Sequence, residues 1–374
     1  MAQNLAEKYS EKVDERFSHE SYAANVTGND YTFDGVDTVY VYSMPTTQMT
    51  DYNRHPASAV DRYGVPIDLQ ASRQCMKMNR DRSFTYIIDK GDNLQTLGIY
   101  DANRSLSRQI NEVIIPEYDT YVFRTLAAKA TAMGNISKTT PTKSNAYSLF
   151  LKGQEFMGNH VVPDEGRVAV CSYAYSNLLM QDPSFIRYGD ASQQMLTKGV
   201  IGEVDGVKIM KVPSSRLPAG CNCILTHPYA SIAPRQLLEY KIHDNPPGIS
   251  GWKVEGRLIY DCFVLNNKVD GIYYIGGAAV LRVLNVRAAL SAVNPGNYIP
   301  MVDPAPENGS TMYFRTGTTA TEVEYGATIA TDEWVALSEA GTEITPDEDD
   351  RLLEVVEVDA NGKAVGYGKT FLSD

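Results

Sequence analysis

The sequence predicts an α+β protein, and three observations support this class. One long helical pattern runs from Gly98 to Met133. Strand and helix patterns mix between residues 147 and 242 without a regular βαβ period, and residues 301–374 contain only strand patterns. The chain has 374 residues, which is long enough for two or three domains with cores of their own.

Apolar residues within the long helical pattern recur at steps of three and four, so they share one stripe. They are Leu106, Ile110, Val113, Ile114, Tyr118, Tyr121, Val122 and Leu126. We expect Asp101 or Asn103 to cap the start, Gly134 to cap the end, and the helix to span roughly 50 Å. Pro116 removes an amide donor, which predicts a bend within one helix. The alternative is two shorter helices joined at Ile115-Pro116.

The N-terminal segment predicts a short amphipathic helix over residues 3–18. Its apolar residues lie at four-residue steps: Leu5, Tyr9, Val13 and Phe17. Such a helix is too short to be stable alone, so we expect it to lie on another surface, in this chain or a neighbour. Residues 20–35 are polar and predict a flexible arm. No secretory signal is recognisable, and no apolar run approaches the 18 residues or so that a membrane span needs.

Two alternating patterns predict strands, from Thr38 to Met44 and from Ser83 to Asp89. Residues 45–82 between them are polar and contain no apolar run. Loops of this length are unusual within compact domains and are commonly functional. We therefore expect an extended hairpin that projects from the body and is stable only when it lies on something else.

The remaining elements follow from short patterns and turn dipeptides. Helices are predicted over 147–156, 173–181 and 233–242, and strands over 167–172 and 222–226. Hairpins are predicted over 198–212 around Asp205-Gly206 and over 253–275 around Asn266-Asn267. A boundary is expected at Asn294-Pro295-Gly296, followed by a small, separate β domain with strands over 311–315, 333–337, 352–358 and 364–370 and a turn at Asn361-Gly362.

The net charge of −12 lies in the C-terminal segment, because residues 301–374 hold 16 Asp/Glu and 4 Lys/Arg. The rest of the chain is neutral and has no basic footprint for nucleic-acid binding. The five scattered cysteines predict reduced thiols.

No catalytic, cofactor or metal site is predicted. The segment Gly362 to Thr370 imitates a phosphate loop, but five residues separate Gly362 from Gly368 where the motif has four, and no helix can follow, so a strand is expected. Cys221 and Cys223, with His227 nearby, lack the second ligand pair of a structural zinc site, so buried strand cysteines are expected. Cys171 with His160 is a chance pairing.

The order of arm, long hairpin, long helix, α/β region and returning hairpin resembles the major capsid proteins of tailed phages, which have the HK97-type fold. The segments that carry the resemblance lie within residues 1–276: LAEKYSEKVDERF, FDGVDTVYVYSMPT, FTYIIDKGDN, INEVIIPEYDTY and GVIGEVDGVKIMKVPSSRLP. They are similar to capsid proteins of phages of Gram-positive hosts. No single motif is diagnostic; the succession is.

The resemblance implies an HK97-like domain organisation. It comprises an N-terminal arm (1–35), an E-loop (36–95), a P-domain spine helix (96–140), an A-domain (141–250), P-domain return strands with a linker (251–300) and an acidic accessory β domain (301–374). It also implies self-assembly through hexamers and pentamers into an icosahedral shell around double-stranded DNA, without enzymatic activity, cofactor or sequence-specific DNA binding. The alternative is an encapsulin-type nanocompartment shell of the same fold; an enzyme is less favoured.

The resemblance further implies partners and a location: other copies of the chain, a portal protein, a separate scaffolding protein and decoration proteins, no membrane, and a virion assembled in the host cytoplasm. Tyr42 to Met76 contains no lysine, so no E-loop crosslink is expected. Candidate intersubunit contacts are the four apolar arm residues and Arg54, Arg62, Arg104, Arg108 and Glu112. For the helix residues, the alternative is a solvated charged face, which would also include Asp119.

Overall fold

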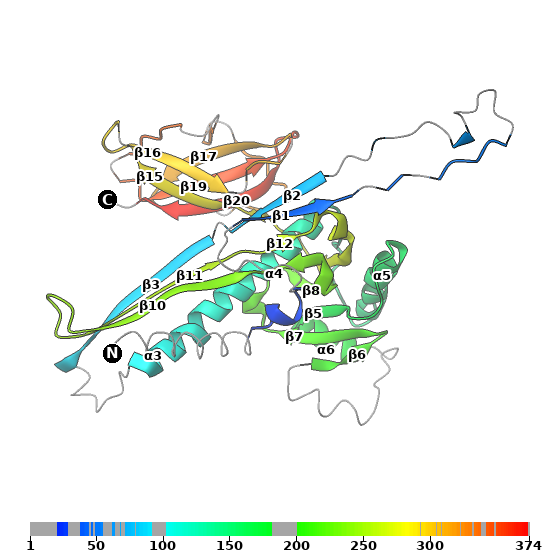
Figure 1. Cartoon of the computed structure of the whole chain (residues 1–374), viewed down its shortest axis with the longest axis horizontal. Helices are drawn as coiled ribbons and strands as arrows, with labels where there is room; N and C mark the ends of the chain where they lie inside the picture. The colour runs from blue at the N-terminus through cyan, green and yellow to red at the C-terminus, as the bar shows by residue number, and fades with distance from the viewer. Residues whose placement is uncertain are drawn as a thin grey trace.

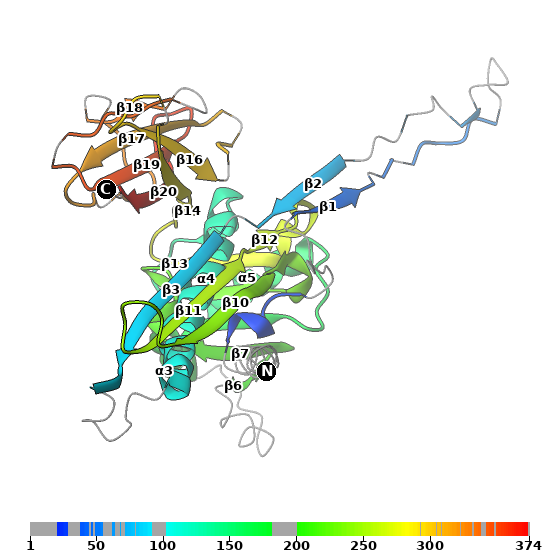
Figure 2. The same cartoon turned by 60° about the vertical axis from the view of Figure 1, so that its left-hand side comes forward.

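The computed structural model shows a long helix between two sheets, a projecting hairpin and a C-terminal β sandwich (Figures 1 and 2). None of its described helices is long and apolar enough to cross a membrane. The structure describes residues 21–28, 38–44, 46–47, 49–54, 62–63, 68, 72–78, 80–91, 102–181, 200–291, 293–303, 305–307, 309–321, 323–330, 333–337, 342–347 and 349–372.

One continuous helix runs through the main body, so the single predicted helix is confirmed (Figure 1). It comprises α3 (Ala102–Gln109), a π-helical turn, η3 (Ile110–Ile114), and α4 (Ile115–Ala132). Asn103 lies inside α3 and is not its cap; Asp101 lies outside the described residues. The end is as predicted. Gly134 has a φ of 80°, its N–H bonds to the Thr131 carbonyl (3.1 Å), and the Asn135 N–H bonds to that of Ala130 (2.9 Å). These two bonds form a Schellman motif.

The π turn lies directly before Pro116 and is the structural response to it. The N–H of Ile115 bonds to the carbonyl of Ile110, five residues back, where an α-helix would use the residue four back. The extra residue shifts the buried stripe from Ile110 to Ile115, both of which are buried. Val113 is 46% exposed, so its predicted place on the buried stripe is wrong.

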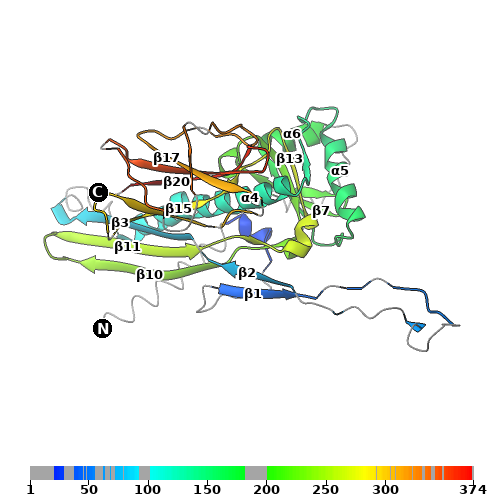
Figure 3. The same cartoon turned by 90° about the horizontal axis from the view of Figure 1, so that it is seen from above.

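The first sheet runs alongside α4 (Figure 3) and has the antiparallel order β10-β11-β3. Its strands are β3 (Arg80–Asp89), β10 (Arg235–Asp244) and β11 (Gly251–Tyr260). Ile88, Val254 and Leu258 share a hydrophobic core with the helix.

Two predictions in this region are wrong. The predicted helix 233–242 is strand β10, because its ladder with β11 outweighs the local helix propensity. The predicted hairpin over 253–275 is also wrong, because β11 pairs with β10 and β3. Asn266-Asn267 is the start of a 3₁₀ helix, η6 (Asn266–Gly271), and not a hairpin turn.

The second sheet has six strands in the order β4-β13-β8-β5-β7-β6. The predicted elements 147–156, 167–172, 173–181, 198–212 and 222–226 are confirmed here, and Asp205 and Gly206 form the hairpin turn with positive φ. One face of the sheet packs on α5 and α6, and the other packs on α4. The elements are β4 (Ile136–Ser137), α5 (Ala146–Asn159), β5 (Val168–Ser172), α6 (Tyr173–Gln181), β6 (Val200–Val204), β7 (Val207–Val212), β8 (Cys221–Thr226) and β13 (Ile272–Gly276).

The predicted hairpin is present at its base, where β1 (Thr38–Ser43) pairs with β2 (Ser72–Lys77). It projects away from the main body (Figures 1 and 3). No sequence pattern predicted β2, whose side chains are mostly polar. Short elements at the hairpin base are η5 (Pro228–Ala230), β9 (Ser231–Ile232) and β12 (Phe263–Val264), whereas η4 (Ser214–Arg216) lies against α4.

The C-terminal unit begins earlier than predicted. Asn294-Pro295-Gly296 lies in the turn between β15 and β16, and Leu281 and Leu284 already belong to the cores of this unit. The four predicted strands and the turn at Gly362 (φ 74°) are confirmed. The strands are β14 (Arg282–Val283), β15 (Asn285–Leu290), β16 (Tyr298–Asp303), β17 (Thr311–Gly317), β18 (Val335–Ala336), β19 (Leu352–Val358) and β20 (Ala364–Phe371).

Candidate assembly surfaces

The sequence features that imitate chemical sites lie in ordinary strands and turns of the fold. Gly362 to Thr370 is a turn followed by β20. Cys223 is fully buried in β8 and faces Cys171 of β5, with 3.2 Å between the sulfur atoms, and burial raises the pKa of the Cys223 thiol. His227 Nε2 donates to the Glu165 carbonyl (3.0 Å), and its Nδ1 accepts from the Tyr229 N–H (3.2 Å). In the part of the chain that the structure describes, no three His, Cys, Asp or Glu side chains group as a metal site would require.

The hairpin has two unlike faces because its residues alternate. Val39 and Val41 pack with Met76, Met78, Ile232 and Leu265 in a small core at the hairpin base. Gln74 ties this base to the body, since its Nε2 donates to the Val264 carbonyl (2.9 Å). Tyr40 and Tyr42 point the other way and are 49% and 69% exposed. The hairpin therefore offers an aromatic face to solvent.

The outer part of the hairpin keeps contacts between its two limbs. The Asn53 N–H bonds to the Arg62 carbonyl (3.0 Å), and the rings of Tyr52 and Tyr63 meet edge to face at 5.0 Å. Arg54 is exposed, and Arg62 donates to the Tyr52 hydroxyl (3.4 Å). Both predicted arginine contacts thus lie on the exposed hairpin; their role between subunits stays a prediction.

Two of the three predicted contact residues on the long helix pair with each other. Arg108 and Glu112 form an exposed ion pair one helical turn apart, with Nε and Oε1 at 3.0 Å. The side chain of Arg104 and the four apolar arm residues, Leu5, Tyr9, Val13 and Phe17, lie outside the described residues. An exposed pair of this kind is screened by solvent and contributes little to stability.

Asp119, expected on the solvated face, is fully buried, and that expectation is wrong. Its carboxylate accepts hydrogen bonds from the Ser21 hydroxyl (2.6 Å), the backbone N–H groups of Tyr22 (3.2 Å) and Ala23 (3.1 Å), and Arg216 Nη1 (2.9 Å). The guanidinium of Arg216 also lies over the Tyr22 ring.

These bonds hold residues 21–28, which we call the arm root, against α4. The segment contains a short 3₁₀ turn, η1 (Ala23–Asn25), and buries Ala23 and Val26 in the main core. Gly28 donates to the Ser231 carbonyl (2.8 Å). The expectation of a flexible arm over residues 20–35 is therefore wrong for the arm root, because α4 supplies a buried acceptor for it.

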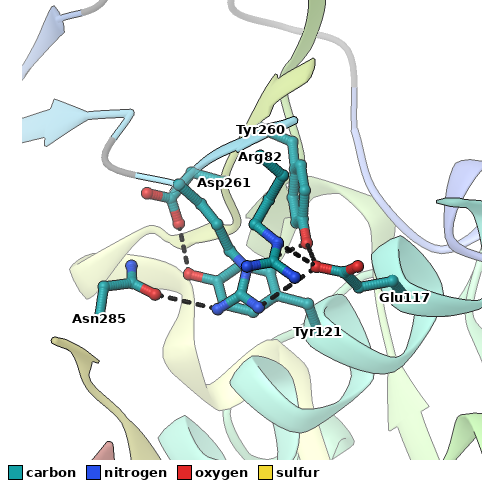
Figure 4. Close-up of polar contacts among 7 residues, drawn as sticks. Arg82, Glu117, Tyr121, Tyr260, Asp261 and Asn285 are labelled. Atoms are coloured by element: carbon teal, nitrogen blue, oxygen red, sulfur yellow. Dashed lines mark hydrogen bonds and ion pairs between the residues drawn. The ribbon is translucent and has the colours of Figure 1, made fainter. Parts of the chain in front are cut away.

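A second polar cluster, which we call the junction, joins four parts of the chain (Figure 4). Arg80 of β3 lies over the ring of Tyr121 of α4 (4.7 Å) and donates to the Tyr260 hydroxyl of β11 (2.9 Å) and to Asn285 Oδ1 of β15 (3.0 Å). Glu117 of α4 accepts from Arg82 Nε (2.9 Å) and from the Tyr260 hydroxyl (2.9 Å). The start of β3 at Arg80 and Arg82, which we call the hairpin root, thus meets the long helix, β11 of the first sheet and the sandwich here.

The electrostatics of the junction favour a charged Glu117. Burial alone would raise its pKa, but the hydrogen bond from Tyr260 and the charges of Arg82 and Arg80 lower the pKa below its ordinary value. Tyr121 donates to Asp261 Oδ1 (2.7 Å), and burial, followed by the charge of Asp261, raises the pKa of that tyrosine.

Sequence reasoning missed both clusters, although one signal was present. Asp119 sits one turn after Ile115 and beside Tyr118, among residues that the helix buries. A carboxylate on a buried stripe needs a buried partner. The partners themselves, 97 residues away along the chain in either direction, have no pattern that would reveal them.

No protein-family model matches the chain, and no curated protein matches it in sequence. Its structure is similar to solved structures. A chain of Mycobacterium phage Che8 is 16% identical with a TM-score of 0.55, and the match covers 68% of this chain and 90% of that chain. A chain in the asymmetric unit of the bacteriophage PhiM1 mature capsid is 12% identical with a TM-score of 0.51, covering 68% and 86%. The chain therefore has the HK97-type fold of tailed-phage major capsid proteins, as its sequence predicted.

Proposed function

We propose that this chain is the major structural protein of a phage capsid, and that its copies assemble through hexamers and pentamers into an icosahedral shell around double-stranded DNA. The observation that carries the proposal is the projecting hairpin with its aromatic face. Tyr42 is 69% exposed and Tyr40 49%. A neighbouring copy that covered this face would remove apolar surface from water, at about 25 cal/mol per Å². Repeating one such contact around a ring closes it.

The parts of the chain then take the roles that the fold suggests. Residues 36–95 are the E-loop and α3 to α4 the spine of the P-domain. The A-domain is the six-stranded sheet with α5 and α6, and we end it before Arg235, because β10 pairs with β11 and so belongs to the P-domain sheet. The sandwich from about residue 281 is the accessory domain.

The charge distribution fits a shell that encloses DNA without reading its sequence. Residues 1–300 are neutral overall, and the surplus of carboxylates lies in the accessory domain. DNA-binding proteins that depend on phosphate contacts carry a surplus of basic residues, and residues 1–300 have no such surplus overall. Portal, separate scaffolding and decoration proteins complete the set of proposed partners, with the virion as the location.

Electron microscopy and sedimentation of particles purified from producing cells test the proposal. Closed shells that contain DNA in infected cells are expected. A single small species at all protein concentrations would refute self-assembly. Shells of the same form that hold protein cargo would replace the capsid by a nanocompartment.

A double substitution in the hairpin tests whether its aromatic face contributes to assembly. Substituting Tyr40→Ser and Tyr42→Ser together should leave the melting temperature of the subunit nearly unchanged, because both rings are exposed, and should reduce shell yield strongly. The control is Tyr173→Ser on α6, which is also half exposed but lies outside the hairpin. Normal shells from the hairpin variant would remove the main support for the proposal.

A further inference from the structure

The junction holds more positive charge than its carboxylates balance. Along α4, Glu117, Tyr121 and Arg124 follow each other at steps of four and three, so they share one side of the helix. Arg80 and Arg82 approach this side from β3, and both contact Glu117. With Asp261, which accepts from Tyr121, three guanidinium groups face two carboxylates.

Arg124 is the member of this group without a counter-charge. Its side chain is partly buried, and no hydrogen bond or ion pair joins it to any residue that the structure describes. Burial, and then the like charge of Arg80, lower the pKa of Arg124. The neighbouring Tyr367 of β20 does not compensate, because burial and its hydrogen bond to Glu354 raise the pKa of that phenol and keep it neutral.

An unpaired guanidinium in partly buried surroundings, beside a second one, is unfavourable in an isolated subunit. The chain as a whole carries a net charge of −12, and residues 301–374 supply 16 carboxylates against 4 basic groups. Other copies of the chain are therefore rich in the group that Arg124 lacks. This charge complementarity favours a second copy as the partner over DNA, whose phosphates the acidic residues 301–374 would repel.

We propose that Arg124, supported by Arg80, receives an Asp or Glu side chain of a second copy, and that this ion pair is an assembly contact beside the hairpin root. The inference rests on the proposed function, since it requires many copies placed side by side. A guanidinium binds a carboxylate through two parallel hydrogen bonds, so the contact would fix orientation as well as charge. It would also couple the arrival of a neighbour to the base of the hairpin through Arg80.

Arg124→Gln tests the inference, because the two readouts should move in opposite directions. The isolated subunit, below the concentration at which shells form, should melt at the same or a higher temperature, since an unpaired charge beside Arg80 is gone. The concentration needed for shell formation should rise about tenfold or more. Arg124→Lys keeps the charge but lacks the two parallel donors of a guanidinium. The concentration that it needs for shell formation should lie between those of the wild type and Arg124→Gln.

The control is Lys129→Gln on the same helix, because Lys129 already has a carboxylate of its own chain, Glu307, at 3.8 Å. This variant should leave shell formation nearly unchanged. A photo-crosslinking residue in place of Arg124 should join two copies through an acidic segment.

Three results would overturn the inference. They are unchanged assembly of Arg124→Gln, a parallel loss of melting temperature and assembly, and crosslinks confined to one chain. Failure of the wild-type chain to form shells would instead count against the proposed function.

Discussion

Asp119→Ala should release the arm root from the spine helix. The carboxylate is fully buried and accepts four hydrogen bonds, one of them from Arg216 and two from backbone N–H groups at the start of η1. Removing one partner of a buried ion pair costs about 3–5 kcal/mol. The side chain of Arg216 is 20% exposed and can gain some water, so we expect the lower end, about 3 kcal/mol.

This loss is comparable with what else holds the arm root. Burial of Val26, with a smaller share from Ala23, contributes about 1.5–3 kcal/mol. The response with the lowest free-energy cost is therefore local detachment of residues 21–28, in which the freed N–H groups become hydrated. The rest of the subunit stays folded. A loss of about 3 kcal/mol corresponds to a roughly 100-fold larger opening equilibrium constant for this segment.

Hydrogen exchange measured by mass spectrometry checks the prediction directly. Peptides that contain Tyr22 to Gly28 should lose protection, whereas peptides from β8 should keep it. Asp119→Asn preserves shape but presents an amide to Arg216, so it should give a smaller effect. Glu112→Ala is the matched control, because it removes an exposed carboxylate that pairs with one arginine on the same helix. Unchanged protection of the arm root in Asp119→Ala would refute the reasoning.

Three further predictions test the helix and the junction. Gly134→Ala should cost about 1 kcal/mol, since φ is 80° there, whereas Gly158→Ala, also with open space around its Cβ, should stabilise by about 0.5–1 kcal/mol; thermal melts compare them. Glu117→Gln should lose stability near neutral pH and progressively less as the pH falls below the ordinary value of 4.5: a lowered folded pKa stabilises above that value, and the gain disappears as the pH falls through the folded value, so a stability difference from the wild type that does not shrink with falling pH would contradict it. Deleting Val113 should cost about 3 kcal/mol by bringing the Pro116 ring against an α-helical carbonyl, and adding Pro116→Ala should recover most of it; no recovery would mean that the proline is not the cause of the π turn.

The sequence was most informative where a local rule acts alone. Gly134 ends the helix because only a residue that tolerates positive φ completes the Schellman motif. Asp205-Gly206 fixes its hairpin in the same way. β10 shows the limit. Its segment is rich in helix-forming residues, and a bulge between Leu237 and Glu239 breaks the two-residue alternation that would have indicated a strand. Its partner β11 decides the conformation, and that pairing has no local signal.

The site was harder to predict because one inserted residue decides which side of the spine helix is buried. Counting from Ile110 at 3.6 residues per turn, an unbroken α-helix would point Glu117, Tyr121 and Arg124 toward the core. The π turn adds about 100° of rotation before α4, so the most deeply buried series becomes Ile115, Tyr118 and Val122, while Tyr121 stays buried at the edge of the core beside the junction. The charged side then faces Arg80 and the sandwich. The apolar run Val113-Ile114-Ile115 fits either register, so the sequence could not choose between them. The same turn that accommodates Pro116 thus builds the junction, and any contact that Arg124 makes with a second copy depends on it.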